Sequence, residues 1–349
     1  MAQTAPSPSR LQSLPGCVPT PFRFAGMGVY SPRERRASQA FDTAFGKPEG
    51  WTEKTFGIAS RTVAAPDETT SAMGAEAVRR ALASAGWGAD EFDVLIGACA
   101  VMEQPIPGAS VLIQEALGLG RSGIPAFDVN LTCLSFLAAL DVAALGFAAG
   151  RWRRAVVVAS DIASAGLNET DPVACVIFGD GAAAVCIERA EAPAGPGLLA
   201  GRFETYGDAR EVARLRAGGT RLRPQDGLET FLSGSKFEMD AFAVFKAAAR
   251  PLPVLMDRVL AEAGLDRDSV DLIIPHQASS AALEHLRRLF PGEPSRVVDI
   301  FADHGNQIAA SLPTTLRHAW SDGRLGPGKT ALLLGTAAGI SLGAMAFRF

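Results

Sequence analysis

A cysteine at the start of an apolar segment is the residue of this sequence best suited to covalent chemistry. Cys133 follows the polar residues Asn130 and Thr132 and precedes a mostly apolar run that ends at Gly150. A thiol at a helix start lies near unpaired backbone N–H groups and the positive end of the helix dipole, which can lower its pKa from about 8.5 to roughly 3.5–7.5. We therefore predict that Cys133 is a nucleophile with a lowered pKa.

Two later segments carry a histidine and an asparagine where a side chain can face a pocket. His276 directly follows the apolar run 272–275, and Asn306 follows Gly305. Side chains at the ends of strands and in turns are more often presented to a pocket than packed in a core. Cys133, His276 and Asn306 form the predicted catalytic constellation.

The elements that must position these residues are short apolar runs separated by helical segments. Helices are expected at 70–85, 133–149, 242–263 and 280–289, with Thr132 as N-cap and Gly150 as the stop of the second. Strands without polar alternation are buried on both faces. Their alternation with helices predicts an α/β fold with mostly parallel sheets covered by helices.

The apolar runs also repeat. The first set is 93–96, 127–129, 155–159 and 183–189, and the second set is 271–274, 298–300, 331–335 and 343–349. We predict two similar halves, 22–192 and 193–349, after a proline-rich tail at 1–21. The uncharged stretch 331–347 is interrupted by three glycines, which favours two buried strands joined by a turn over a membrane span.

Composition excludes several classes of function. Lys plus Arg number 33 against 37 for Asp plus Glu, without long runs of like charge, so nucleic acid is not an expected partner. Five cysteines without a CxxC pair favour free thiols in a reducing compartment, and the first twenty residues lack an apolar signal segment. We predict a cytoplasmic protein without a membrane span, a metal site or a bound cofactor.

Several motifs in the same order resemble β-ketoacyl-(acyl-carrier-protein) synthase III, a family of condensing enzymes with the thiolase fold. The similarity extends from about 22 to 349. The resemblance implies a five-layered α-β-α-β-α body of two related halves, usually a homodimer, with Cys133, His276 and Asn306 as the triad. The matching segments are 50–51, 57–58, 64–69, 127–129, 178–183, 275–278, 304–306 and 310–313.

The resemblance also implies a reaction, the decarboxylative Claisen condensation of an acyl primer with a malonyl thioester. Cys133 takes the acyl group from CoA or an acyl carrier protein, and His276 and Asn306 stabilise the charge left on the thioester oxygen when CO2 departs. The backbone N–H groups of Cys133 and Ala338 would hold the oxyanion of the acyl-transfer step. Fatty-acid initiation and a specialised biosynthetic pathway both fit.

Further positions follow from the same resemblance. Arginines that hold CoA in the family are replaced by Thr55, Ala165 and Ala281, which favours a carrier-protein donor or weak CoA binding. Glu103 is a possible general base. The predicted substrate-binding residues are Trp51, Leu134, Ile106, Phe242 and Ser279, with Ile106 reaching across the dimer, and the predicted carrier-docking residues are Lys246, Arg287 and Arg288.

Alternatives remain open. A thiolase-fold enzyme can instead move the acyl group from the cysteine to an alcohol, an amine or a second acyl thioester without decarboxylation, or can act as a non-catalytic binding partner. The order Cys, His, Asn also occurs in papain-like proteases, but their cysteine lies near the mature N-terminus beside a tryptophan. His285 and His318 are expected at the surface or at an interface, and His304 is expected to order its loop.

Overall fold

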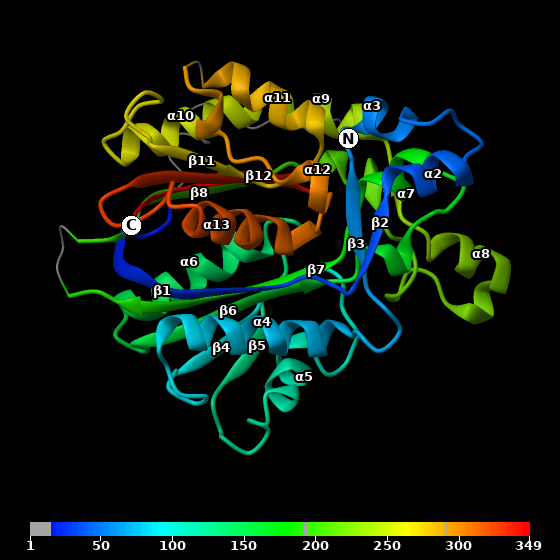
Figure 1. The fold of residues 1–349 in the computed structure, drawn as a ribbon. Coiled ribbons are helices and arrows are strands. Elements are labelled where there is room, and N and C mark those ends of the chain that lie inside the picture. Colours follow the sequence, from blue (N-terminus) through cyan, green and yellow to red (C-terminus); the bar gives the residue numbers. More distant parts are fainter. Residues whose placement is uncertain (1–14, 192–194, 291) are drawn as a thin grey trace, which may run out of the picture.

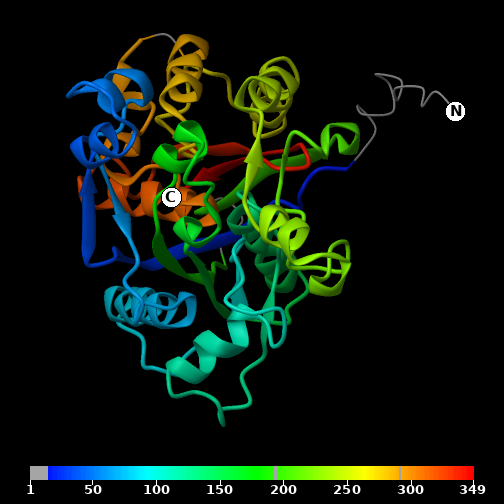
Figure 2. The same cartoon turned by 90° about the vertical axis from the view of Figure 1, so that its right-hand side faces the viewer.

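Two β-layers separate three helical layers in the computed structural model, which describes residues 15–191, 195–290 and 292–349 (Figure 1). Helices α9 (Ala241–Ala249), α10 (Pro251–Glu262) and α11 (Ser280–Leu289) form one outer layer. Helices α4 (Thr70–Ala85) and α5 (Ala109–Ala116) form the other. Helices α6 (Ser135–Ala148) and α13 (Ser311–Ser321) lie between the sheets, and Figure 2 shows these layers from the side. The predicted five-layered α/β body is confirmed.

The strands form one continuous hydrogen-bonded series that folds into the two β-layers. Its order is β11 (Leu272–Pro275), β12 (Thr330–Ala337), β13 (Ser341–Arg348), β8 (Gly197–Thr205), β1 (Thr20–Tyr30), β7 (Gly181–Arg189), β6 (Arg154–Asp161), β4 (Val94–Gly97) and β5 (Ala126–Asp128). Strand β1 links the layers, since Thr20 and Pro21 pair with β8 and the following residues pair with β7.

The prediction of mostly parallel sheets is wrong. Only β4 with β5, β4 with β6 and β11 with β12 run parallel among the described strands, whereas the other neighbours in the series are antiparallel. Strands β12 and β13 are separated by three residues, and a connection this short allows only antiparallel pairing. The predicted pair of buried strands within 331–347 is confirmed.

The repeat has a counterpart in strand pairing. In each β-layer a parallel pair, β4 with β6 or β11 with β12, is followed by an antiparallel strand, β7 or β13. The predicted match of 127–129 with 298–300 is wrong, because 127–129 lies at β5 whereas 298–300 is no strand. Beside it, Ile273 and Val297 form an isolated parallel bridge, in which the Val298 N–H donates to the Ile273 carbonyl at 2.9 Å. The boundary predicted between 192 and 193 and residues 1–14 of the predicted tail lie outside the described residues, and β1 already begins at Thr20.

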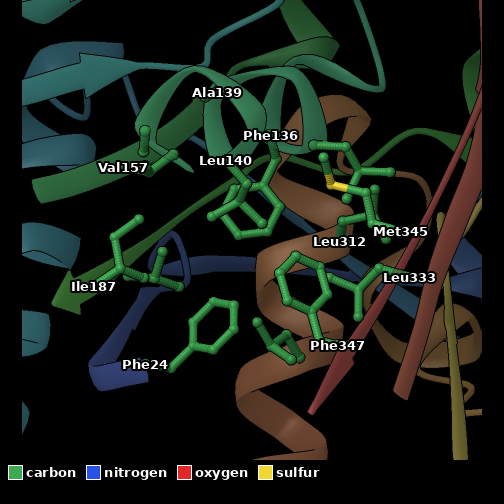
Figure 3. Packing of buried hydrophobic residues seen from close by; sticks show 14 of the residues in the cluster. Phe24, Phe136, Ala139, Leu140, Val157, Ile187, Leu312, Leu333, Met345 and Phe347 are labelled. Carbon is green, nitrogen blue, oxygen red and sulfur yellow. The ribbon is translucent and has the colours of Figure 1, made fainter. Parts of the chain in front are cut away.

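The core lies mainly between the two β-layers. Phe136 and Leu140 of α6, Leu312 of α13 and Phe347 of β13 pack together there, all fully buried (Figure 3). Burying an apolar side chain of this size stabilises the fold by about 1.5–3 kcal/mol. This packing fixes α6, and therefore the cysteine before it, relative to both sheets.

One predicted helix is divided. The segment 242–263 forms α9 and α10, and the break falls at Arg250 and Pro251. Proline lacks a backbone N–H and clashes with the preceding turn, so it cannot continue α9, but it suits the first position of α10. The bend places α9 against the cavity described below.

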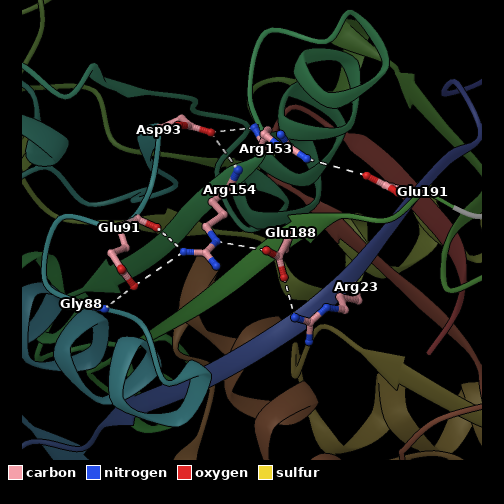
Figure 4. A network of polar contacts seen from close by, with 8 residues as sticks. All are labelled: Arg23, Gly88, Glu91, Asp93, Arg153, Arg154, Glu188 and Glu191. Atoms are coloured by element: carbon pink, nitrogen blue, oxygen red, sulfur yellow. Dashed lines mark hydrogen bonds and ion pairs between the residues drawn. The ribbon is translucent and has the colours of Figure 1, made fainter.

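Ion pairs join the neighbouring strands β1, β7 and β6. Arg154 pairs with Glu188 at 3.1 Å, and Glu188 also pairs with Arg23 (Figure 4). One Asp93 carboxylate oxygen accepts hydrogen bonds from the backbone N–H groups of Arg153 and Arg154 at 2.6 and 2.9 Å. None of these residues lines the catalytic cavity described below.

Smaller elements complete the described chain: β2 (Glu34–Ala37), α2 (Ser38–Ala44), α3 (Trp51–Phe56), β3 (Ser60–Val63), α7 (Pro172–Ile177), β9 (Ala213–Arg214), α8 (Leu228–Gly234), β10 (Glu238–Met239) and α12 (Phe301–His304). Among the described residues, every helix is too short or too polar to span a bilayer.

Candidate active site

Cys133, His276 and Asn306 line one cavity of about 850 Å³. Cys133 comes from the turn before α6, His276 from the end of β11, and Asn306 from the segment between α12 and α13. The turn that joins β12 and β13, residues 337–339, also lines the cavity. Three residues far apart in the sequence therefore face one space.

Cys133 lies in a tight turn ahead of the helix, not in its first turn. Thr132 has a φ of 47°, and its buried hydroxyl has no hydrogen-bond partner among the described residues, so the predicted N-cap is wrong. No side chain caps α6. The Ser135 hydroxyl instead bonds to the preceding turn, since it accepts from the Leu131 N–H at 2.9 Å and donates to the Thr132 carbonyl at 2.6 Å. These bonds close the turn that presents the thiol.

The thiol is protonated at neutral pH. Burial, together with the nearby Asp161 carboxylate, raises the pKa of Cys133 to about 12, although the N–H groups of Cys133 and Ala338 oppose the shift. The predicted lowered pKa is wrong, because the loss of hydration outweighs the stabilisation by those N–H groups. The same two N–H groups lie close enough to affect the sulfur, which is where an oxyanion hole for an acyl-cysteine must be.

His276 is a buried, neutral imidazole. Its backbone N–H donates to the Leu334 carbonyl at 2.8 Å, and its Nδ1 has no hydrogen-bond partner among the described residues. Burial lowers the pKa of His276 to about 4, so the ring carries no charge at pH 7. A neutral ring can donate one N–H to a developing negative charge.

The Asn306 carboxamide is oriented by backbone contacts. Its Oδ1 accepts from the Ile308 N–H at 2.9 Å, and its Nδ2 makes only a long contact of 3.5 Å with the Ala278 carbonyl. The oxygen is therefore occupied, and the amide N–H groups are the part of Asn306 available to a ligand.

Sequence reasoning missed Asp161, which lies at the end of β6 and is fully buried. One carboxylate oxygen accepts from the N–H groups of Ala100 and Val101 at 2.8 and 2.7 Å, and the other accepts from Ala309 at 3.0 Å. Burial raises the pKa of Asp161 to about 7 despite these N–H donors. An acidic residue at the end of the largely apolar run 155–159 was the available signal.

The predicted substrate-binding residues divide into two groups. Ser279 lines the cavity, and its hydroxyl caps α11 by accepting from the Ala282 N–H at 3.2 Å. Leu134 is fully buried beneath the site, and Ile106 and Phe242 are 85 % and 75 % exposed. Trp51 packs edge-on against Phe56 in α3. The structure does not place Leu134, Ile106, Phe242 or Trp51 in the cavity wall.

The predicted docking charges are partly neutralised. Arg287 pairs with Asp299 and Glu284, and Arg288 pairs with Glu284 at 3.4 Å. Lys246 is exposed on α9. Glu103, the possible base, lines the cavity, and one of its oxygens accepts from the Ser71 N–H at 2.7 Å.

The histidine predictions have different outcomes. His285 is partly buried between α11 and α9, where its ring packs against Phe245, and it lines the cavity, a position that the sequence did not indicate. His318 is exposed as expected, and His304 contacts the Ile300 carbonyl through Nδ1 at 3.1 Å within its own loop. Among the described residues, no group of three or more His, Cys, Asp and Glu side chains is arranged to hold a metal ion. The absence of a metal and of a bound cofactor stays a prediction.

Comparison with known proteins agrees with this arrangement. The family model for 3-oxoacyl-[acyl-carrier-protein (ACP)] synthase III matches residues 127–207, and the model for its C-terminal part matches 260–349. The β-ketoacyl-[acyl-carrier-protein] synthase III of Shigella dysenteriae is 32 % identical over 327 residues, which cover 94 % of this chain and 99 % of the relative.

Two solved structures show the same fold across nearly the whole chain. The 3-oxoacyl-[acyl-carrier-protein] synthase III from Aquifex aeolicus has a TM-score of 0.84 and 27 % identity, and the match covers 94 % of this chain and 100 % of that one. A priming β-ketosynthase from a polyketide biosynthetic pathway has a TM-score of 0.84 and 28 % identity, with 97 % and 98 % covered. The chain belongs to the β-ketoacyl-(acyl-carrier-protein) synthase III family of condensing enzymes.

Proposed function

We propose that this enzyme transfers an acyl primer to Cys133 and then joins it to the carbanion formed from a malonyl thioester, with loss of CO2. The observation that carries the proposal is that a thiol, a neutral imidazole and an oriented carboxamide line one cavity in a chain of this family. Relatives named for fatty-acid condensation and for polyketide priming support the same reaction type.

In the first half-reaction the Cys133 sulfur bonds to the acyl carbon and the bond from that carbon to the donor's sulfur breaks. The cysteine proton leaves with the donor thiol, so the charges balance. With the pKa of Cys133 at about 12, proton loss must accompany attack. The backbone N–H groups of Cys133 and Ala338 are the donors we assign to the oxyanion of the tetrahedral intermediate.

In the second half-reaction the malonyl carboxylate leaves as CO2, and its electron pair passes to the thioester enolate. We assign stabilisation of the enolate oxygen to the ring N–H of neutral His276 and to the Asn306 amide. Removing one such donor typically costs about 2.7–4 kcal/mol in the barrier. The carbanion then attacks the acyl carbon, and the Cys133 sulfur leaves and recovers a proton.

We propose an acyl carrier protein as the primer donor. Thr55, Ala165 and Ala281 are exposed and offer no charged group to a CoA phosphate. The exposed Lys246 supports attraction of an acidic partner, whereas Arg287 and Arg288 contribute less because acidic neighbours balance them. Better acylation by acyl-CoA than by the acyl carrier protein at equal low concentration would contradict this assignment.

We also propose a cytoplasmic homodimer. The exposed apolar side chain of Ile106 supports the dimer, because such a side chain gains stability when a second copy covers it. Light scattering of the purified protein would test this, since a monomeric mass at micromolar concentration contradicts it.

A second candidate function is acyl transfer without decarboxylation. It is supported by the Glu103 carboxylate in the cavity wall, which is positioned as a possible base. Release of labelled CO2 from malonyl thioester in step with product separates the two reactions.

The decisive experiment is intact-mass spectrometry after incubation with a panel of acyl thioesters. We expect the wild-type protein to gain the mass of one acyl group and Cys133→Ala to gain none. Adding malonyl thioester should discharge the wild-type adduct with CO2 release. Asn306→Ala should keep the adduct and lose most of the CO2 release, which separates the two half-reactions. An adduct that persists in Cys133→Ala would disprove the assigned nucleophile.

A further inference from the structure

The cysteines outside the mechanism differ in what surrounds their thiols. Burial raises the pKa of Cys17, Cys99 and Cys186. Cys175, on α7, is only partly buried and lies beside a cation, the guanidinium of Arg61. A cation beside a thiol favours the thiolate, and the thiolate is the form that peroxides oxidise.

Arg61 is a buried cation without an ion-pair partner among the described residues. It belongs to β3 and is 2 % exposed, with its guanidinium carbon 4.4 Å from the centre of the Phe41 ring. Burial lowers the pKa of Arg61, and the charge of Asp180 opposes this shift. Both Asp180 oxygens, however, already accept hydrogen bonds from Ala64 and Ser164. A buried charge without a partner is costly, and an anion placed beside it offsets that cost.

The guanidinium has an unused donor and a sulfur within reach. Its Nη1 donates to the Phe178 carbonyl, whereas its Nε is buried and has no hydrogen-bond partner in the part of the chain that the structure describes. The Cys175 thiol lies within hydrogen-bonding range of the same guanidinium. Guanidinium groups bind paired anionic oxygens through two N–H groups, as they do in carboxylates. A sulfinate on Cys175 presents such a pair, which a thiol or a sulfenic acid does not offer.

We propose that Cys175 is a modification site, where peroxide oxidises the thiol to a sulfinate that binds the Arg61 guanidinium. In the first step the sulfur bonds to one peroxide oxygen as the O–O bond breaks, which gives a sulfenic acid. The other oxygen leaves as hydroxide and takes up the proton that the thiol released, which gives water. A second peroxide repeats the exchange, so the sulfur loses two electrons in each step. The resulting sulfinic acid releases its proton to water.

The oxidised sulfur acts on the catalytic cavity through the segment 177–179. Arg61 holds the Phe178 carbonyl in the middle of this segment. On either side, the Asn306 N–H donates to the Ile177 carbonyl at 2.7 Å, and the Gly179 N–H donates to the Asn306 carbonyl at 3.1 Å. A sulfinate that draws the guanidinium away from Phe178 therefore loosens Asn306. We expect slower CO2 release, and this consequence rests on the proposed function.

The first test compares two partly buried thiols within one molecule. Cys17 is also partly buried, but its neighbour is the Asp141 carboxylate instead of a guanidinium. Wild-type protein is treated with hydrogen peroxide, and the gain of two oxygen atoms by each cysteine peptide is followed by mass spectrometry. We expect Cys175 to form the sulfinic acid about tenfold faster than Cys17. Equal rates would overturn the inference, and this comparison needs no catalytic activity.

A variant of the cation tests its part in the oxidation. Arg61→Lys keeps the positive charge but loses the forked pair of donors, so it should slow the step from sulfenic to sulfinic acid at Cys175. An unchanged rate of that step would show that the guanidinium does not bind the product. If Arg61→Lys does not fold, the ratio of the Cys175 and Cys17 rates in the wild type still decides.

The consequence for catalysis is tested with Cys133 protected as its acyl adduct during the peroxide treatment. Peroxide is then removed, malonyl thioester is added, and CO2 release is measured in a single turnover. The wild type and Cys17→Ser should lose most of their CO2 release, whereas Cys175→Ser should keep it, because serine cannot be oxidised in this way. Equal losses in the wild type and Cys175→Ser would overturn the link between Cys175 and the cavity.

Discussion

The Asp161 carboxylate accepts a hydrogen bond from the Ala309 N–H at 3.0 Å, across 148 residues of sequence. Asp161 ends β6, and Ala309 lies three residues after Asn306. The other carboxylate oxygen holds Ala100 and Val101, which line the cavity. One buried carboxyl group therefore fixes both a wall of the cavity and the segment that carries Asn306, the proposed catalytic carboxamide.

We predict that Asp161→Asn impairs decarboxylation more than acylation. An asparagine can offer an oxygen to Ala100 and Val101, but its NH2 group would then face the Ala309 N–H, and two donors repel. The loss of this bond should lower the free energy of unfolding by about 1–3 kcal/mol. Displacement of Asn306 should reduce CO2 release about tenfold, while the acyl adduct still forms.

The matched control is Asp93→Asn, which also loses a carboxylate that accepts two backbone N–H groups, but away from the cavity. It should lower stability and leave the ratio of decarboxylation to acylation unchanged. Equal changes of that ratio in both variants would show that Asp161 acts only on stability.

The Cys133 thiol should react slowly with alkylating reagents at neutral pH. Since the pKa of Cys133 is about 12, its thiolate fraction rises about tenfold per pH unit through the whole range accessible to a folded protein. We expect the rate of iodoacetamide labelling, followed on the Cys133 peptide, to increase from pH 7 to pH 10 without a plateau. A plateau below pH 8 would show that the free enzyme holds a thiolate.

His276 should make stability depend on pH in the acid range. Its pKa is about 4 in the folded protein and 6.5 in the unfolded chain, so the unfolded chain binds more protons between these values. The contribution of the buried neutral ring to the free energy of unfolding is thus complete above pH 6.5. It is lost as pH falls through 4, and it amounts to about 3 kcal/mol in total.

Asp161 changes stability with pH in the opposite direction, over an overlapping pH range. The pKa of Asp161 is raised from 3.8 to about 7, so its contribution is complete below 3.8 and is lost as pH rises through 7. The two effects are separated by comparing wild type with His276→Asn in urea unfolding from pH 4 to pH 7. The difference in unfolding free energy should grow with pH, and a constant difference would refute the lowered pKa of His276.

The three residues that share the cavity could be found from sequence because each follows a recognisable local pattern. Cys133 precedes an apolar helix, and His276 and Asn306 lie at the end of a strand and after a glycine. The division at Pro251 was also readable, since proline forbids a continuous helix. These features depend on neighbours in the chain.

What could not be predicted depends on contacts between distant segments. His285 has the same helical pattern whether α11 faces solvent or α9, and only tertiary packing decides between them. The direction of the Cys133 pKa shift depends on burial by several elements at once. Thr132 is not the predicted N-cap, because it adopts a positive φ in the turn before α6. The Ser135 hydroxyl stabilises this turn by donating to the Thr132 carbonyl.

Gly335 on β12 leaves room for His276, the proposed enolate donor, and we predict that Gly335→Ala reduces decarboxylation. A Cβ at Gly335 would lie 2.6 Å from the Cβ of His276 and 3.2 Å from the Leu134 side chain. No real Cβ contact is that short, so the strand or the histidine must shift. Because the enolate oxygen needs a donor at about 2.7–3.1 Å, a shift of a few tenths of an ångström should lower CO2 release at least tenfold.

The matched control for Gly335→Ala is its register partner on β13, Gly343. A Cβ there would lie 2.9 Å from the Phe203 ring, which does not line the cavity, and 3.2 Å from the Leu134 side chain, the same distance to Leu134 as from a Cβ at Gly335. The two variants therefore differ in the close approach to His276, which only Gly335→Ala makes. Both substitutions should destabilise the sheet, by about 1–3 kcal/mol for overpacking. Only Gly335→Ala should lower the rate of CO2 release per folded molecule. If Gly343→Ala lowered that rate equally, the effect would come from the sheet as a whole and not from the position of His276.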